Sequence, residues 1–147
     1  MKHPQTLATR LYEHFPDETL GKIKSKACCA FVLLWCLGIE PDEDADAITM
    51  IDDLLKKKAL KPDCTVLWES AIKALTGRTL KSIDFVKIKT IGNIKERTPV
   101  RYDYNGSSHW VGVENGIIAF NPLSFSVCVE CGRPAEKRVL HIEGVNL

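Results

Sequence analysis

A histidine and an asparagine lie near the two ends of one short apolar segment, SSHWVGVENGIIAFNPL, residues 107–123. The dipeptide Asn115-Gly116 in its middle is typical of a tight hairpin turn between two strands. In such a hairpin His109 and Asn121 lie near each other at the open end. An asparagine amide oxygen can accept the imidazole N–H and fix the tautomer and orientation of the ring. We therefore expect Asn121 to hold His109 in position as a general base.

Two adjacent cysteines provide a candidate nucleophile for this base. Cys28 and Cys29 begin the apolar segment from Ala27 to Leu37, which is expected to form a helix buried on all sides. The helix dipole and the free N–H groups of a first helical turn lower the pKa of a thiol and favour the thiolate, which attacks carbonyl carbon. Adjacent helical residues point about 100° apart, so the two thiols cannot face His109 equally well.

This order of residues resembles that of papain-like cysteine peptidases, in which a helix-borne cysteine precedes a histidine and then an asparagine or aspartate on consecutive strands. The segment HWVGVENGIIAFNP is especially similar to the H-[WF]-V-V…G…D-P segment of the bacteriocin-leader-processing (double-glycine) peptidases. Small uncharacterised bacterial and prophage proteins of the same clan are more similar still. Their G-C-Y-F-L-S, D-C-F and S-K-R motifs correspond to CCAFVL at 28–33, PDCTV at 62–66 and EKRVL at 136–140, so the resemblance spans residues 22–142.

The resemblance implies a thiol hydrolase that cleaves, or transfers at, an amide or peptide bond through a Cys-His-Asn triad without a cofactor. His109 corresponds to the catalytic histidine and Asn121 to the residue that orients it. Alignment with the small bacterial proteins makes Cys29 the nucleophile, and we favour this choice; alignment with the C-W-A-F motif of papain makes it Cys28. The implied partner is a peptide or peptide-like substrate, with no nucleic acid or membrane, and the oligomeric state stays open.

The glutamine side chain that donates to the oxyanion in papain-like peptidases has no counterpart at the expected position of this chain. Papain-like enzymes carry a glutamine shortly before the nucleophile, whereas this chain has Lys22 and Ile23 there, and its only glutamine is Gln5. The N–H of the nucleophile itself and Ser25 remain as candidate donors. Because loss of one such donor costs about 2.7–4 kcal/mol in other enzymes, a catalytically inactive papain-like binding module is an alternative.

A zinc site is a second alternative. The segment CVECG at 128–132 has the C-x-x-C spacing of zinc ligands. A second C-x-x-C is absent, so a complete site would also require residues from the set Cys28, Cys29, Cys64 and His141. If this segment is a strand, Cys128 and Cys131 point to opposite faces of it, and we therefore assign no metal ligands.

The surrounding elements divide the chain into a helical half and a strand half. Helical periodicity is present in residues 5–15, 27–37, 45–58 and 65–76. Residues 17–24 are polar and expected to form a loop with at most one helical turn, and Ser25 is expected to be the N-cap of the next helix. After residue 80, alternating patterns predict strands at IDFVKIKTI, TPVRYDY, HWVGVE, IIAFN, FSVCVE and KRVLHIE, with a turn at Gly132-Arg133-Pro134. We therefore expect one α+β domain, residues 1–147, with N-terminal helices packed on a C-terminal antiparallel sheet of about five or six strands.

The composition is that of an ordinary globular protein. The chain has 147 residues, a net charge of +1 and 45% apolar residues, which gives no indication of nucleic-acid binding. Neither a leader peptide nor a membrane-spanning run is recognisable, so we expect a cytoplasmic protein whose mature chain is the whole chain, unless a phage-type or leaderless route exports it. Its six cysteines are then expected to be free thiols.

Overall fold

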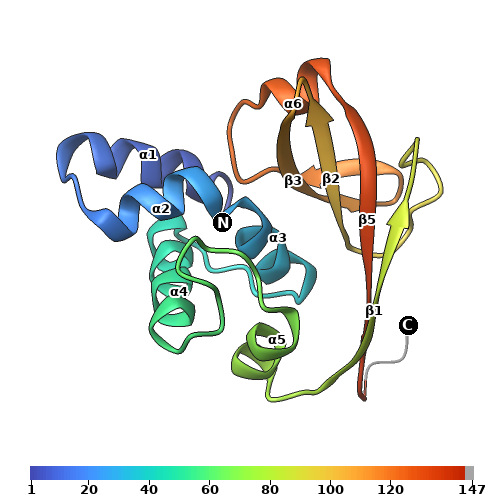
Figure 1. Ribbon diagram of the computed structural model, residues 1–147, viewed down its shortest axis with the longest axis horizontal. Helices are drawn as coiled ribbons and strands as arrows, with labels where there is room; N and C mark the ends of the chain where they lie inside the picture. The colour runs from blue at the N-terminus through green and yellow to red at the C-terminus, as the bar shows by residue number, and fades with distance from the viewer. Residues whose placement is uncertain (145–147) are drawn as a thin grey trace.

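The computed structural model describes residues 1–144 and places the helices on one side of the molecule and an antiparallel sheet on the other (Figure 1). The helices are α1 (Pro4–His14), α2 (Glu18–Lys26), α3 (Cys28–Cys36), α4 (Asp44–Lys56), α5 (Trp68–Thr76) and α6 (Val127–Cys131). The strands are β1 (Leu80–Lys87), β2 (Thr98–Tyr104), β3 (Ser107–Glu114), β4 (Ile117–Phe120) and β5 (Arg133–Ile142). This arrangement confirms the predicted α+β class, with five strands in the sheet.

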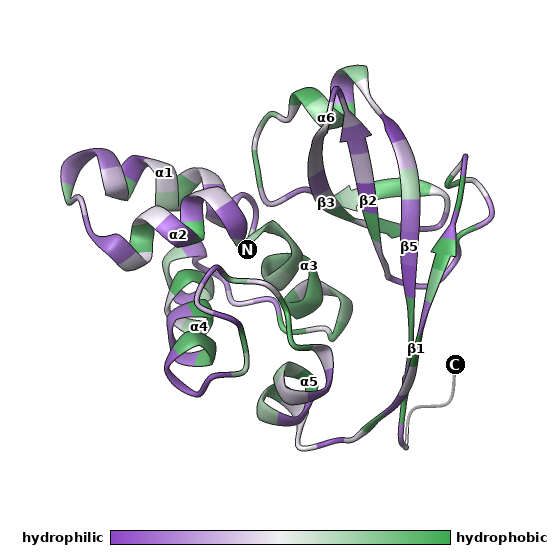
Figure 2. Ribbon diagram, viewed as in Figure 1, coloured by the Kyte–Doolittle hydropathy of each residue, from purple (hydrophilic) through white to green (hydrophobic). Residues whose placement is uncertain are grey.

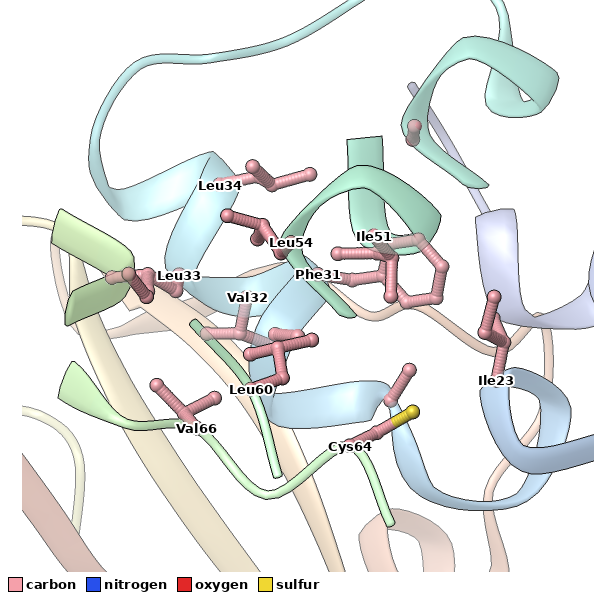
Figure 3. Close-up of a cluster of buried hydrophobic side chains, with 14 of the residues drawn as sticks. Ile23, Phe31, Val32, Leu33, Leu34, Ile51, Leu54, Leu60, Cys64 and Val66 are labelled. Atoms are coloured by element: carbon pink, nitrogen blue, oxygen red, sulfur yellow. The ribbon is translucent and has the colours of Figure 1, made fainter. Parts of the chain in front are cut away.

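Helix α3 forms the centre of the helical half. It is apolar on every face (Figure 2), and residues 30–34 are completely buried. Figure 3 shows Phe31 packed beside Ile51 of α4, with Leu60 and Val66 from the following loop close to Val32. Burial of each such side chain stabilises the fold by about 1.5–3 kcal/mol, so α3 is held firmly in place.

Helix α3 also packs directly on the sheet. A Cβ atom at Gly112 in β3 would collide with the indole ring of Trp35, so only glycine permits this approach. The Trp35 ring stacks on Phe120 of β4 with a centroid separation of 6.0 Å. The helix that begins with the two cysteines is therefore fixed against the hairpin that carries the histidine.

The sheet has the strand order β1-β5-β2-β3-β4, and all of its neighbouring strands are antiparallel. The predicted hairpin turn at Asn115-Gly116 is present, with φ values of 53° and 75° that suit a type I′ turn. Pairing between β3 and β4 extends only as far as Gly112 and Phe120. Residues 109–111 therefore lack a strand partner on that edge of β3.

Three local predictions were wrong. Residues 17–24 lie mostly in helix α2, because the Asp17 side chain accepts the Leu20 N–H at 3.1 Å and caps it; Ser25 is inside this helix and is not an N-cap. The segment FSVCVE contains the short helix α6, where the Ser126 carbonyl accepts the N–H groups of residues 129 and 130. The expected turn at 132–134 is instead the beginning of β5.

Helix α6 covers one face of β2 and β3, opposite the face that meets α3. A second apolar cluster lies beneath it and includes Val100, Tyr102, Val111 and Val113 with Cys128 of α6. Within residues 1–144, no helix combines the length and apolar character needed to cross a membrane.

Candidate active site

His109 and Asn121 meet at the end of the β3–β4 hairpin, as predicted. The His109 Nε2 atom lies 2.7 Å from the Asn121 Oδ1 atom, and His109 is only 4% exposed. The two residues meet even though strand pairing stops before them, because Asn121 directly follows the last residue of β4.

The hydrogen-bond pattern determines the tautomer of His109. The Asn121 Oδ1 atom also accepts the backbone N–H of Leu123 at 3.0 Å, and a backbone N–H can only donate. The atom that faces His109 is therefore the amide oxygen, so Nε2 of the ring must carry the proton. In the neutral ring Nδ1 then has a free lone pair and is the nitrogen that can act as a base.

The first turn of α1 holds the loop that carries Asn121. The Gln5 N–H donates to the Pro122 carbonyl at 3.0 Å, and the Ser124 N–H donates to the Thr6 hydroxyl at 2.9 Å. The ring of His3 lies with Nδ1 2.9 Å from the Asn121 carbonyl oxygen. Residues almost 120 positions earlier in the chain therefore fix Asn121, and nothing in the local sequence pattern indicated this.

Cys28 lies close to β3 at Trp110, the residue that follows His109 in the chain. The backbone N–H groups of Trp110, Cys29 and Cys28 itself act on its thiol and lower its pKa, against the larger effect of burial. The Trp110 nitrogen is only two covalent bonds from the Cα atom of His109. Helix α3 contacts β3, and its first residue lines the same hollow as Ser108 and Trp110, which flank His109 in that strand.

Cys29 faces a different environment. The titratable groups that act on its thiol are Cys28, Arg138 and Cys36, and no backbone N–H group lowers its pKa as at Cys28. Burial raises the pKa of Cys29 well above its ordinary value, and the Arg138 charge opposes this only in part. The choice between the two thiols stays a prediction, but these contacts favour Cys28 rather than Cys29.

The direction of two pKa shifts describes the resting state of the site. Burial lowers the pKa of His109, and its hydrogen bond with Asn121 offsets this only partly. Burial also raises the pKa of Cys28, although the three backbone N–H groups act in the opposite direction. Both shifts favour a neutral thiol beside a neutral imidazole, which is the pairing needed for general-base activation during attack.

A hollow of about 420 Å³ opens beside the two cysteines. Its walls come from the beginning of α3, from the loop that carries Cys64, and from the strands that carry Ser108 and Trp110. A larger hollow of about 770 Å³ lies at the other end of α3, where Cys36 lines it, far along the helix from the candidate site. Of these two hollows, the smaller one is lined by the cysteines of α3's first turn.

Within residues 1–144, His109 has no hydrogen bond to either thiol. Catalytic hydrogen bonds of this kind often form only when substrate is bound. Gln5 does not replace the missing upstream glutamine, since its Nε2 donates to the Lys24 carbonyl at 2.8 Å and ties α1 to α2.

The zinc alternative finds little support in the geometry. No group of three or more His, Cys, Asp or Glu side chains in the described part of the chain is arranged to hold a metal ion. Cys128 is buried against the second apolar cluster, whereas Cys131 is exposed at the end of α6.

In comparisons with known proteins, no family model, no curated protein and no solved structure matches this chain.

Proposed function

We propose that the protein is a papain-like thiol hydrolase that acts on an amide or related acyl group, with Cys28 as nucleophile, His109 as base and Asn121 as the residue that orients His109. The observation that carries this proposal is the Asn121 hydrogen bond, which leaves Nδ1 of His109 unprotonated on the strand whose Trp110 N–H acts on the Cys28 thiol.

The proposed reaction uses no group from outside the chain except substrate and water. The Cys28 sulfur forms a bond to the carbonyl carbon while its proton passes to Nδ1 of His109. The C–N bond then breaks, and the leaving amine takes this proton, which leaves a thioester on Cys28. Water attacks the thioester and gives a proton to Nδ1; the acid product leaves, and the proton returns to the sulfur.

Support for an oxyanion site comes from the N–H groups around the Cys28 sulfur. The N–H groups of Cys28 and Cys29 belong to the first turn of α3, where they have no partner within the helix, and the N–H of Trp110 approaches from β3. Donors in these positions stabilise negative charge that develops close to the sulfur. They provide a substitute for the side-chain donor that the chain lacks.

Site-resolved alkylation tests the proposal. Iodoacetamide is expected to modify Cys28 faster than Cys29 or Cys64, and His109→Ala is expected to slow this reaction without slowing the modification of the exposed Cys131. Cys29→Ser is the matched control and should leave the Cys28 rate unchanged. If Cys28 reacts no faster than the buried thiols, or reacts equally well without His109, the hydrolase proposal is wrong and the binding-module alternative is favoured.

A further inference from the structure

The charged side chains that line the hollow beside Cys28 are all positive. They are Lys26 from the end of α2, Arg101 from β2 and Arg138 from β5, and no carboxylate of residues 1–144 lines it. The hydroxyls of Ser25, Thr65 and Ser108 are the other polar side chains there. A substrate group that enters this space therefore meets cations and hydrogen-bond donors.

Arg101 has little capacity left for a ligand. Its Nε and Nη2 atoms donate to the two carboxylate oxygens of Asp103 at 2.9 and 3.1 Å, and its Nη1 donates to Glu136 at 2.9 Å. This guanidinium is neutralised by two acidic groups that stand outside the hollow.

Arg138 is different, because within residues 1–144 its guanidinium has one hydrogen-bond partner, Glu136. Its Nη1 donates to Glu136 at 2.5 Å, but its buried Nε has no hydrogen-bond partner within residues 1–144. The guanidinium carbon lies over two aromatic rings, 4.1 Å from the centroid of Phe85 and 4.8 Å from that of Trp110. Stacking of this kind fixes the plane of an arginine while its edge stays available for a bidentate contact.

We propose that the hollow selects substrates with a carboxylate close to the bond that is cleaved, and that Arg138 binds this carboxylate. This inference rests on the proposed function. The fork of guanidinium donors matches the two oxygens of a carboxylate. An acidic side chain and the free carboxyl end of a peptide both carry this group, and protection by blocked tripeptides distinguishes these two sources. In this role Arg138 determines specificity and takes no part in the chemical steps.

A pair of matched alkylating reagents tests the inference without any need for turnover. Iodoacetate and iodoacetamide transfer the same carbon to sulfur, but only iodoacetate carries a carboxylate. At each thiol, the rate with iodoacetate is divided by the rate with iodoacetamide. The value at Cys28, normalised by the value at the exposed reference thiol Cys131, is expected to be about 10. Arg138→Gln should bring this normalised ratio down to about one, whereas Arg138→Lys, which keeps the charge but not the fork, should give an intermediate value.

Arg10→Gln is the matched control, because it removes an arginine from the exposed surface of α1 and should leave the ratio unchanged. A ratio near one in the native protein, or one that Arg138→Gln does not change, would overturn the inference and leave the hydrolase proposal intact. Failure of both reagents to modify Cys28 would instead overturn both proposals.

Protection by blocked tripeptides identifies the source of the carboxylate. A tripeptide with a central glutamate and an amidated end should slow the iodoacetamide reaction at Cys28 if an acidic side chain is bound. An uncharged tripeptide with a free carboxyl end should do so if the end of the chain is bound. If neither protects better than the amidated tripeptide with a central glutamine, the carboxylate assignment is wrong.

Discussion

At the scale of single residues, Asn121 controls which nitrogen of His109 can act as a base. Its Oδ1 atom accepts from both Leu123 and His109, so the ring proton is held on Nε2. Without this acceptor the buried ring is free to rotate or to change tautomer.

Replacement of Asn121 by alanine is therefore expected to slow the alkylation of Cys28 by roughly 10- to 100-fold, which corresponds to the loss of one strong buried hydrogen bond. Asn121→Asp should retain most of the rate, because a carboxylate can accept from both donors. Peptide mapping by mass spectrometry gives the rate at each thiol. An alanine variant with the native rate would show that Asn121 does not orient the base.

The lowered pKa of His109 also predicts how stability depends on pH. Burial lowers its pKa in the folded chain below the unfolded value of about 6.5, so the unfolded chain binds more protons as the pH falls below that value. The free energy of unfolding should therefore decrease as the pH falls from about 7 to 5. His109→Gln should reduce this slope in urea titrations, and His14→Gln is the control at an exposed histidine. A slope that is the same in all three proteins would contradict the account.

At the scale of elements, the site depends on how closely α3 approaches β3. Gly112 permits this approach, and the early end of β4 leaves room for the first turn of α3 at the strand edge. The burial of α3 on all sides fixes both contacts.

Gly112→Ala should destabilise the protein by about 1–3 kcal/mol, because the added methyl group overlaps the Trp35 ring in a packed interior. Gly92→Ala is the control, since a Cβ at that position meets no atom within 4 Å and its φ is not in the left-handed region. Urea denaturation, monitored by tryptophan fluorescence, measures the free energy of unfolding of both variants. Equal stability of the two variants would show that α3 does not pack closely on β3.

The sequence patterns were sufficient for the central hairpin and for the His109–Asn121 contact, because hairpin turns and alternation are local signals, but they wrongly assigned FSVCVE to a strand. The strand TPVRYDY was predicted with its observed bounds of 98–104. Helix α2 was missed because its helicity depends on the Asp17 cap and on packing against α1 more than on apolar periodicity. Arg138 and the contacts of α1 with the Asn121 loop were also missed, since they join residues far apart in the chain and have no local signature.

At the scale of the whole molecule, Arg97 connects the helical half to the sheet. Its Nη1 donates to the Trp35 carbonyl at 2.8 Å at the end of α3, and its guanidinium lies 4.4 Å from the centroid of the Trp35 ring. Ion pairs to Glu40 at 3.0 Å and to Glu114 at 3.4 Å link both halves to the same side chain.

Arg97→Ala should lower the free energy of unfolding by about 1–3 kcal/mol, through loss of the carbonyl hydrogen bond and the cation–π contact more than through the partly exposed ion pairs. Lys57→Ala, which breaks an exposed pair with Asp53, is the control and should change stability by no more than about 0.5 kcal/mol. Similar losses in the two variants would mean that Arg97 contributes only as a surface charge.

The most direct test of the account is whether an acyl group can be trapped on Cys28. The native protein is incubated with the activated ester of a short peptide that carries a glutamate, and the adduct is located by mass spectrometry. We predict one acyl group per chain, on Cys28, which does not form in His109→Ala and forms normally in Cys29→Ser. An adduct that is absent, that lies on another thiol, or that forms equally well without His109 would contradict the assignment of Cys28 and His109 as nucleophile and base.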